Sequence, residues 1–308
     1  MRIVFMGTPQ FAVPALKKIA SSIIAVVTQP DRPRGRGHRF QPSPIKEAAL
    51  ALEIPVFQPA RIKDEPFLQQ LKELAPDLIV VVAFGQILPP ALLTIPPLGC
   101  VNVHASLLPQ LRGAAPIQRA IMNGDTITGV TTMYMDEGLD TGDIIFQEAE
   151  EILPDDTAGS LARRLALKGA DLLQRTVEAI SQGTAPRKPQ DSSLASWAPP
   201  LTKEEEILDW NEAAINLSNR VRALNPKPGA VTFVGGSRLK IWQARAVSDK
   251  ITAEKPGQVL KIDGNDGILV STGKGALLVQ EVQPAGKRAM SATAYACGYR
   301  VQPGDMWG

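Results

Sequence analysis

The sequence of 308 residues has few of the residues that mark secreted, metal-binding or membrane-spanning proteins. Its two cysteines, Cys100 and Cys297, lie far apart and match neither a disulfide framework nor a metal-ligand spacing. No apolar run reaches the ~18 residues that a membrane span requires. We therefore expect a cytoplasmic protein in a reducing compartment, with no membrane partner and no metal.

Histidine is equally scarce, since His38 and His104 are the only two. A reaction that needs a neutral base near pH 7 therefore has few candidates. Residues 101–104 read Val-Asn-Val-His, a pattern typical of the end of a strand. Side chains two positions apart on a strand point to the same face, so Asn102 and His104 are predicted to face the same way.

The alternative for His104 is a hydrogen-bonded histidine of the core. The Ser-Leu-Leu-Pro turn at residues 106–109 argues against it, because this turn stops the strand and opens a loop at its carboxyl end. A later loop, Gly138 to Asp143, contains Asp140. On its residues alone, Asp140 is best interpreted as a turn residue between glycines.

Asn102, His104, Asp140 and the turn at 106–109 together resemble the enzymes that transfer a formyl group from 10-formyltetrahydrofolate to an amine. The resemblance extends over nearly the whole chain. Its further segments are 6–9, 28–33, 34–37, 42–44, 113–118, 201–205 and 283–287.

The resemblance implies three catalytic residues. Asn102 would hydrogen-bond the formyl oxygen as negative charge develops on it, and His104 would polarise that oxygen or handle the proton. Asp140 would orient the imidazole and help to deprotonate the incoming ammonium. Whether His104 or Asp140 takes the amine proton stays open.

The donor that the resemblance implies is 10-formyltetrahydrofolate, used as a co-substrate without a metal. A planar pterin ring needs an apolar slot with backbone donors and acceptors at its edge. The residues expected to form part of this folate site are Ser106, Leu107, Leu108 and Pro109.

The acceptor that the resemblance implies is initiator methionyl-tRNA, because residues 113–118 and 138–143 follow the spelling of the subgroup that acts on it. An alternative is a related formyltransferase that acts on an amino sugar or a glycinamide nucleotide with the same three residues. A third possibility, from another class, is a non-catalytic RNA-binding protein. The intact catalytic residues argue against it, and a folate-dependent formylation assay separates the two.

Residues 1–190 alternate strand-like and helix-like segments, which predicts an α/β catalytic domain with a Rossmann-like, mostly parallel sheet. The turn after the first expected strand, Gly7-Thr8-Pro9, lacks the three-glycine fingerprint of a dinucleotide site, so the sequence does not support a nucleotide cofactor. The expected strands are 2–6, 23–28, 77–83, 100–104, 131–135 and 143–148, and the expected helices are 11–20, 44–52, 67–74 and 157–180.

Residues 183–206 are rich in Pro, Ser, Thr and Gln, which predicts a linker that runs over the surface. After an expected helix at 210–224, short alternating runs are split by glycine turns, a pattern typical of a small β-barrel or a small sandwich. The resemblance implies that 207–308 form an OB-like β-barrel that binds tRNA.

Positive charge is concentrated in residues 207–308, which carry 13 Lys and Arg against 8 Asp and Glu, whereas residues 1–206 carry 20 against 23. A solvated basic face is the common meaning of such an excess. A basic segment near residue 36 adds to it, with Arg34, Arg36 and Arg39 among glycines and prolines. We expect this segment to be a mobile loop that contacts tRNA phosphates. We also expect the protein to act as a monomer.

Two positions depart from the residues usual in the family. Lys227 follows Asn225-Pro226 where the family commonly has tryptophan, so a stacking role for that aromatic is absent. Phe84 stands where tyrosine is frequent, so its ring is expected to fill the same space without a hydroxyl.

Overall fold

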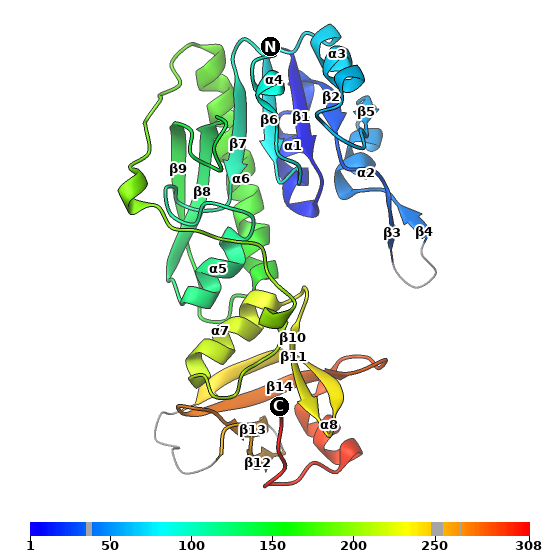
Figure 1. Ribbon diagram of the computed structural model, residues 1–308, viewed down its shortest axis with the longest axis vertical. Helices are drawn as coiled ribbons and strands as arrows, with labels where there is room; N and C mark the ends of the chain where they lie inside the picture. Colours follow the sequence, from blue (N-terminus) through cyan, green and yellow to red (C-terminus); the bar gives the residue numbers. More distant parts are fainter. Residues whose placement is uncertain (35–38, 248–254, 265) are drawn as a thin grey trace. The chain divides into compact units, whose positions relative to one another are not determined.

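A computed structural model describes residues 1–34, 39–247, 255–264 and 266–308, and only the backbone at 33, 34 and 39. Two compact units share the chain (Figure 1). The first consists of Met1–Pro116, Ile127–Glu151 and Ala162–Pro199, and the second of Ile117–Thr126, Ile152–Leu161 and Pro200–Gly308. The first unit therefore continues past the expected boundary at residue 190.

The first unit is built on a sheet that has, within the described residues, seven strands in the order β5-β2-β1-β6-β7-β8-β9. The parallel strands are β5 (Val56–Phe57), β2 (Ile23–Val27), β1 (Ile3–Gly7), β6 (Leu78–Val82) and β7 (Cys100–His104). The antiparallel strands are β8 (Ile127–Tyr134) and β9 (Ile144–Glu151). The predicted mostly parallel sheet is confirmed, and the two-residue β5 is the strand of it that the sequence did not predict.

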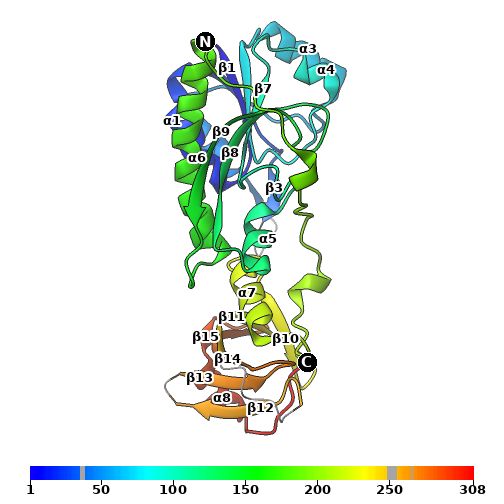
Figure 2. The same ribbon diagram turned by 90° about the vertical axis from the view of Figure 1, so that its left-hand side faces the viewer.

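Helices cover both faces of this sheet (Figure 2), which explains why β1 is apolar along its whole length. Ile3 and Phe5 point into one core, and Val4 and Met6 into the other. The helices packed on the first core are α1 (Val13–Lys18), α2 (Pro44–Ala51) and α6 (Ala158–Ser181), and those on the second are α3 (Glu65–Glu73) and α4 (Pro90–Leu93). In the part of the chain that is described, each helix is too short or too polar to cross a bilayer.

The second unit has an antiparallel sheet in the order β10-β11-β14-β13-β12, with β15 beside β14. Residues near the carboxyl terminus bridge its edges, since Trp307 pairs with Val234 and Met306 with Gln258. The elements are α7 (Ala214–Leu224), β10 (Ala230–Val234), β11 (Ser237–Val247), β12 (Val259–Asp263), β13 (Gly267–Ser271), β14 (Ala276–Pro284), β15 (Met290–Ser291) and α8 (Ala292–Tyr299). A single sheet with bridged edges favours the barrel over the sandwich.

Two segments that precede residue 200 in the sequence complete the second unit. One includes most of α5 (Pro116–Asn123), whose Arg119 donates hydrogen bonds to the Glu205 carboxylate and to the backbone oxygen of Pro200. The other contains Asp156, whose backbone oxygen accepts a hydrogen bond of 2.9 Å from Arg222. Each of the two compact units is therefore built from separate stretches of the chain.

Replacing Glu205 with glutamine is expected to lower the free energy of unfolding by about 1 kcal/mol at pH 7. A hydrogen bond to a charged group contributes about 1.5–3 kcal/mol, and solvent screening at the partly exposed Glu205 reduces that value. The hydrogen bond from Arg119 lowers the pKa of Glu205, so this stability is present above the usual carboxyl pKa and is lost as the pH falls through the lowered one. Urea denaturation at pH 7 and pH 3 measures the change.

Glu137 is an exposed glutamate and provides the control, because Glu137→Gln should leave the unfolding curve unchanged. A Glu205→Gln difference that is equally large at pH 3 and pH 7 would contradict the ionic origin of the effect.

The basic segment near the amino terminus begins and ends as an antiparallel pair of β3 (Arg32–Arg34) and β4 (Arg39–Gln41). Its base is anchored by Asp31, which accepts hydrogen bonds of 2.6 Å from Lys46 and 2.7 Å from Gln58. Arg36 lies outside the described residues, and the side chains of Arg34 and Arg39 do as well. The expected loop therefore has a paired base, and its contact with tRNA stays a prediction.

Candidate active site

The candidate site begins at the carboxyl end of β7. Val101 and Val103 are buried in the core between the sheet and α6, so the alternation of the strand sends Asn102 and His104 to the opposite face. The turn after His104 then removes the chain from the sheet. The predicted common face of Asn102 and His104 follows directly from this geometry.

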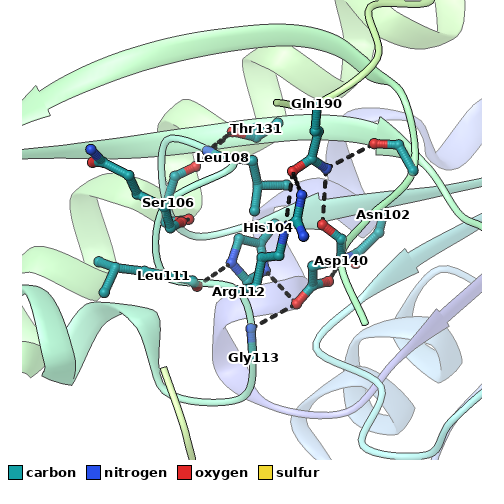
Figure 3. A network of polar contacts seen from close by, with 12 residues as sticks. Asn102, His104, Ser106, Leu108, Leu111, Arg112, Gly113, Thr131, Asp140 and Gln190 are labelled. Carbon is teal, nitrogen blue, oxygen red and sulfur yellow. Dashed lines mark hydrogen bonds and ion pairs between the residues drawn. The ribbon is translucent and has the colours of Figure 1, made fainter. Parts of the chain in front are cut away.

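Asp140 joins these two residues through both of its carboxylate oxygens (Figure 3). Oδ1 accepts a hydrogen bond of 3.3 Å from Asn102 Nδ2, and Oδ2 lies 3.5 Å from His104 Nδ1. Oδ2 also accepts a hydrogen bond of 2.9 Å from the backbone N–H of Gly113. Asp140, which lies 38 positions after Asn102 in the sequence, therefore forms one polar cluster with Asn102 and His104 and is more than a turn residue.

His104 is held at its second ring nitrogen as well. Nε2 lies 3.0 Å from the backbone oxygen of Leu111, and a carbonyl oxygen can only accept, so Nε2 carries a proton. The other ring nitrogen, Nδ1, faces the Asp140 carboxylate. The His104 side chain is 6% exposed. It is therefore a buried, hydrogen-bonded histidine, as the first alternative expects, and it also belongs to the polar cluster with Asn102 and Asp140.

The turn at 106–109 is fixed to the neighbouring strands by hydrogen bonds. Thr131 on β8 donates to the backbone oxygen of Ser106 (2.6 Å) and accepts from the backbone N–H of Leu108 (3.2 Å). Ser106 and Leu108 are buried, whereas Leu107 and Pro109 are partly exposed. Of these four residues, only Leu107 and Pro109 keep surface that a ligand could contact.

A segment of the expected linker runs along the loop that follows the turn at 106–109, beside Arg112 and Gly113. The backbone N–H of Arg112 donates to Ser196 O (2.9 Å), and the backbone N–H of Ala198 donates to Arg112 O (2.7 Å). A Cβ on Gly113 would lie 2.6 Å from Ala198 O, so the close approach of the two segments requires glycine there. This part of 183–206 belongs to the site rather than to a free surface strand.

Two further side chains of the network, Arg112 and Gln190, had no role assigned from the sequence. The guanidinium of Arg112 donates to Gln190 Oε1 from Nε (3.2 Å) and Nη2 (2.8 Å). Arg112 directly precedes the segment 113–118 that carries the resemblance, but no pattern marks Gln190 in its polar segment.

Thiol chemistry is disfavoured at this site. Cys100 is buried in β7, and burial raises the pKa of its thiol to about 12, so the nucleophilic thiolate is absent near neutral pH. In the described ranges, no three side chains of His, Cys, Asp or Glu gather as metal ligands would.

Comparison with family models gives two matches that together span most of the chain. The model described as formyl transferase matches residues 1–177, and the model described as formyl transferase, C-terminal domain, matches residues 200–300. The first match contains Asn102, His104 and Asp140.

Full-length relatives and solved structures agree with this match. Proteins named methionyl-tRNA formyltransferase from Pelotomaculum thermopropionicum and Moorella thermoacetica are each 52% identical to this chain over 311 residues, covering 100% of it and 99% of the relative. An N-formyltransferase from Helicobacter canadensis, in complex with folinic acid and dTDP-3-aminofucose, superposes with a TM-score of 0.67 at 19% identity, covering 91% of this chain and 99% of its own. At that identity the superposition shows the fold alone.

Proposed function

This chain belongs to the formyl transferase family, within it to the methionyl-tRNA formyltransferases, and we propose that 10-formyltetrahydrofolate is its donor and initiator methionyl-tRNA its acceptor. The observation that carries the proposal is the contact of one carboxylate, Asp140, with both Asn102 and His104. The product, N-formylmethionyl-tRNA, serves translation initiation, and we propose on that ground that the enzyme acts in the cytoplasm. We propose that it acts there as a monomer.

Formyl transfer makes three chemical demands. The ammonium of methionine must lose a proton before its nitrogen attacks the formyl carbon, and the tetrahedral oxyanion that forms must be stabilised. The carbon–nitrogen bond to the folate then breaks, and the leaving nitrogen takes up a proton. The site must therefore supply a proton acceptor and a hydrogen-bond donor.

Asn102 supplies the donor in this mechanism. Its amide has two N–H groups, of which one donates to Asp140 Oδ1. The other has no partner among the described residues and is assigned to the formyl oxygen. Because Asp140 fixes the amide in advance, the donor needs no reorientation as negative charge develops.

Asp140 supplies the proton acceptor. Both ring nitrogens of His104 are engaged, Nε2 with the Leu111 carbonyl and Nδ1 with Asp140, so the imidazole reaches the amine only through the carboxylate. We therefore assign the amine proton to Asp140 and the support of that carboxylate to His104. Leu107 and Pro109 provide the apolar wall for the pterin.

The direct test compares three acceptors with 10-formyltetrahydrofolate as donor. Formylation of charged initiator tRNA, followed by mass spectrometry of the released amino acid, should exceed formylation of charged elongator tRNA. Efficient formylation of a nucleotide-linked amino sugar, with none of tRNA, would establish the alternative acceptor instead. Absence of transfer to every acceptor would favour the non-catalytic RNA-binding protein.

Replacement of Arg34, Arg36 and Arg39 by glutamine is expected to raise KM for tRNA and to leave KM for the folate unchanged. Each lost phosphate contact should reduce the slope of log affinity against log salt by about 0.7–0.9. Steady-state kinetics between 50 and 200 mM salt measure both effects. The matched control replaces three exposed lysines of the first unit, Lys17, Lys63 and Lys72.

The control variant should show the wild-type salt slope, because its charge change is the same but lies on other surfaces. Equal losses toward tRNA and folate in the arginine variant would instead place the basic segment over the folate site.

A further inference from the structure

We infer that Gln190 is a positioning residue for formyl transfer, which fixes the backbone of the Asp140 loop and orients the buried Arg112 cation without neutralising it. The inference rests on the proposed function, because it assigns Asp140 to the reaction. It concerns a residue fifty positions from Asp140 in the sequence, in a segment that composition alone describes as a linker.

The Gln190 amide uses both of its ends. Oε1 accepts two hydrogen bonds from Arg112, at 3.2 and 2.8 Å, and Nε2 donates to the backbone oxygens of Asp140 (2.9 Å) and Gly142 (2.8 Å). A guanidinium only donates and a backbone oxygen only accepts, so the orientation of the amide is fixed. No carboxylate, hydroxyl or apolar side chain could make all four of these bonds.

The two bonds to backbone oxygens hold a conformation that the loop needs. Asp140 has φ of 54°, in the left-handed region that residues other than glycine rarely adopt. Its side chain is occupied with Asn102, His104 and Gly113, and therefore cannot also hold the loop. Gln190 bonds the backbone of the loop on either side of Thr141, so the Asp140 carboxylate is not needed to hold the loop and can take part in the reaction.

Arg112 gives the second half of the inference. Its side chain is 3% exposed, and within the described residues its guanidinium is bonded to the neutral Gln190 and to no acid. A buried charge without an opposite charge is costly, so glutamate at position 190 would stabilise the arginine, but it would lose the two N–H donors that hold the Asp140 loop. An amide instead leaves the positive charge of Arg112 uncompensated beside the Asp140 loop. The oxyanion is assigned to Asn102, which donates a hydrogen bond to Asp140, and a positive charge near a developing oxyanion favours the transition state.

The test is Gln190→Glu, which keeps the size and the acceptor for Arg112 but neutralises the arginine and loses both N–H donors. We expect this variant to stay folded, because the new ion pair with Arg112 offsets the two lost bonds to backbone oxygens, while kcat falls by about 10–100-fold with KM for tRNA and folate little changed. A purely structural role would move the melting temperature and spare kcat. Gln182→Glu, at an exposed glutamine before the same segment, is the matched control and should keep the wild-type kcat.

A second variant, Gln190→Met, removes all four hydrogen bonds without adding charge and should also lower kcat. Wild-type kcat in either folded variant would overturn the inference and leave the proposed function standing. A wild-type enzyme that transfers no formyl group to tRNA would overturn the proposed function itself. If Gln190→Glu does not fold, the ion pair with Arg112 is not stabilising and the second half of the inference is wrong.

Discussion

Asp140→Asn should lower kcat for formyl transfer by about 10²–10⁴-fold while the protein remains folded. A carboxylate only accepts hydrogen bonds, and Asp140 accepts them from Asn102 and Gly113. An amide would point an NH₂ group at one of these donors and could not take the amine proton. Single-turnover formylation of charged initiator tRNA, with thermal melting of the variant, measures the effect.

Asp143 provides the control for this substitution. It lies in the same loop, but its carboxylate pairs with Arg187 at 3.5 Å and takes no part in the cluster. Asp143→Asn should therefore keep kcat within a small factor of wild type. Equal losses in the two variants would show that the loop, and not the Asp140 carboxylate, is what the reaction requires.

Asn102→Ala is expected to cost about 2.7–4 kcal/mol of transition-state stabilisation, which is at least ~100-fold in turnover. The variant loses the N–H assigned to the formyl oxygen and also the bond that holds Asp140 Oδ1. Asn102 is half-buried at the end of β7, so the loss should leave the sheet intact. Rapid-quench measurement of the chemical step separates this effect from substrate binding.

The cysteines are the natural controls for this prediction. Cys100→Ala and Cys297→Ser should retain the wild-type chemical step, since neither thiol contacts the cluster. A thiol-blocking reagent that abolished formyl transfer without unfolding the protein would contradict the assignment.

Periodicity predicted the centre of the sheet well because strands β1, β6 and β7 are short and mostly apolar, with side chains buried on both faces. β7 has the expected bounds, and the expected helix at 157–180 appears as α6, Ala158–Ser181. β5 was missed, since two residues give no period. The membership of 117–126 and 152–161 in the second unit was also missed, because it depends on long-range bonds such as Arg119 to Glu205.

The site could be predicted where its residues share a strand and not where they meet through tertiary contacts. Asn102 and His104 are two positions apart on β7, so alternation alone places them together. Asp140 came from the resemblance, since its own neighbours indicate only a turn. Gln190 was missed because polar residues in an aperiodic segment are typical of linkers, and only the backbone pairing of 112 with 196–198 shows otherwise.

The pairing of Arg112 with residues 196–198 also has a consequence for the time at which the enzyme can become active during its synthesis. A chain leaves the ribosome from its amino terminus at about 5–20 residues per second. Asn102, His104 and Asp140 emerge early, but Gln190 and its neighbours emerge fifty residues after Asp140. A nascent chain therefore carries Asn102, His104 and Asp140 for some seconds without the segment that holds the Asp140 loop, and a chain that terminates before this segment is released without it.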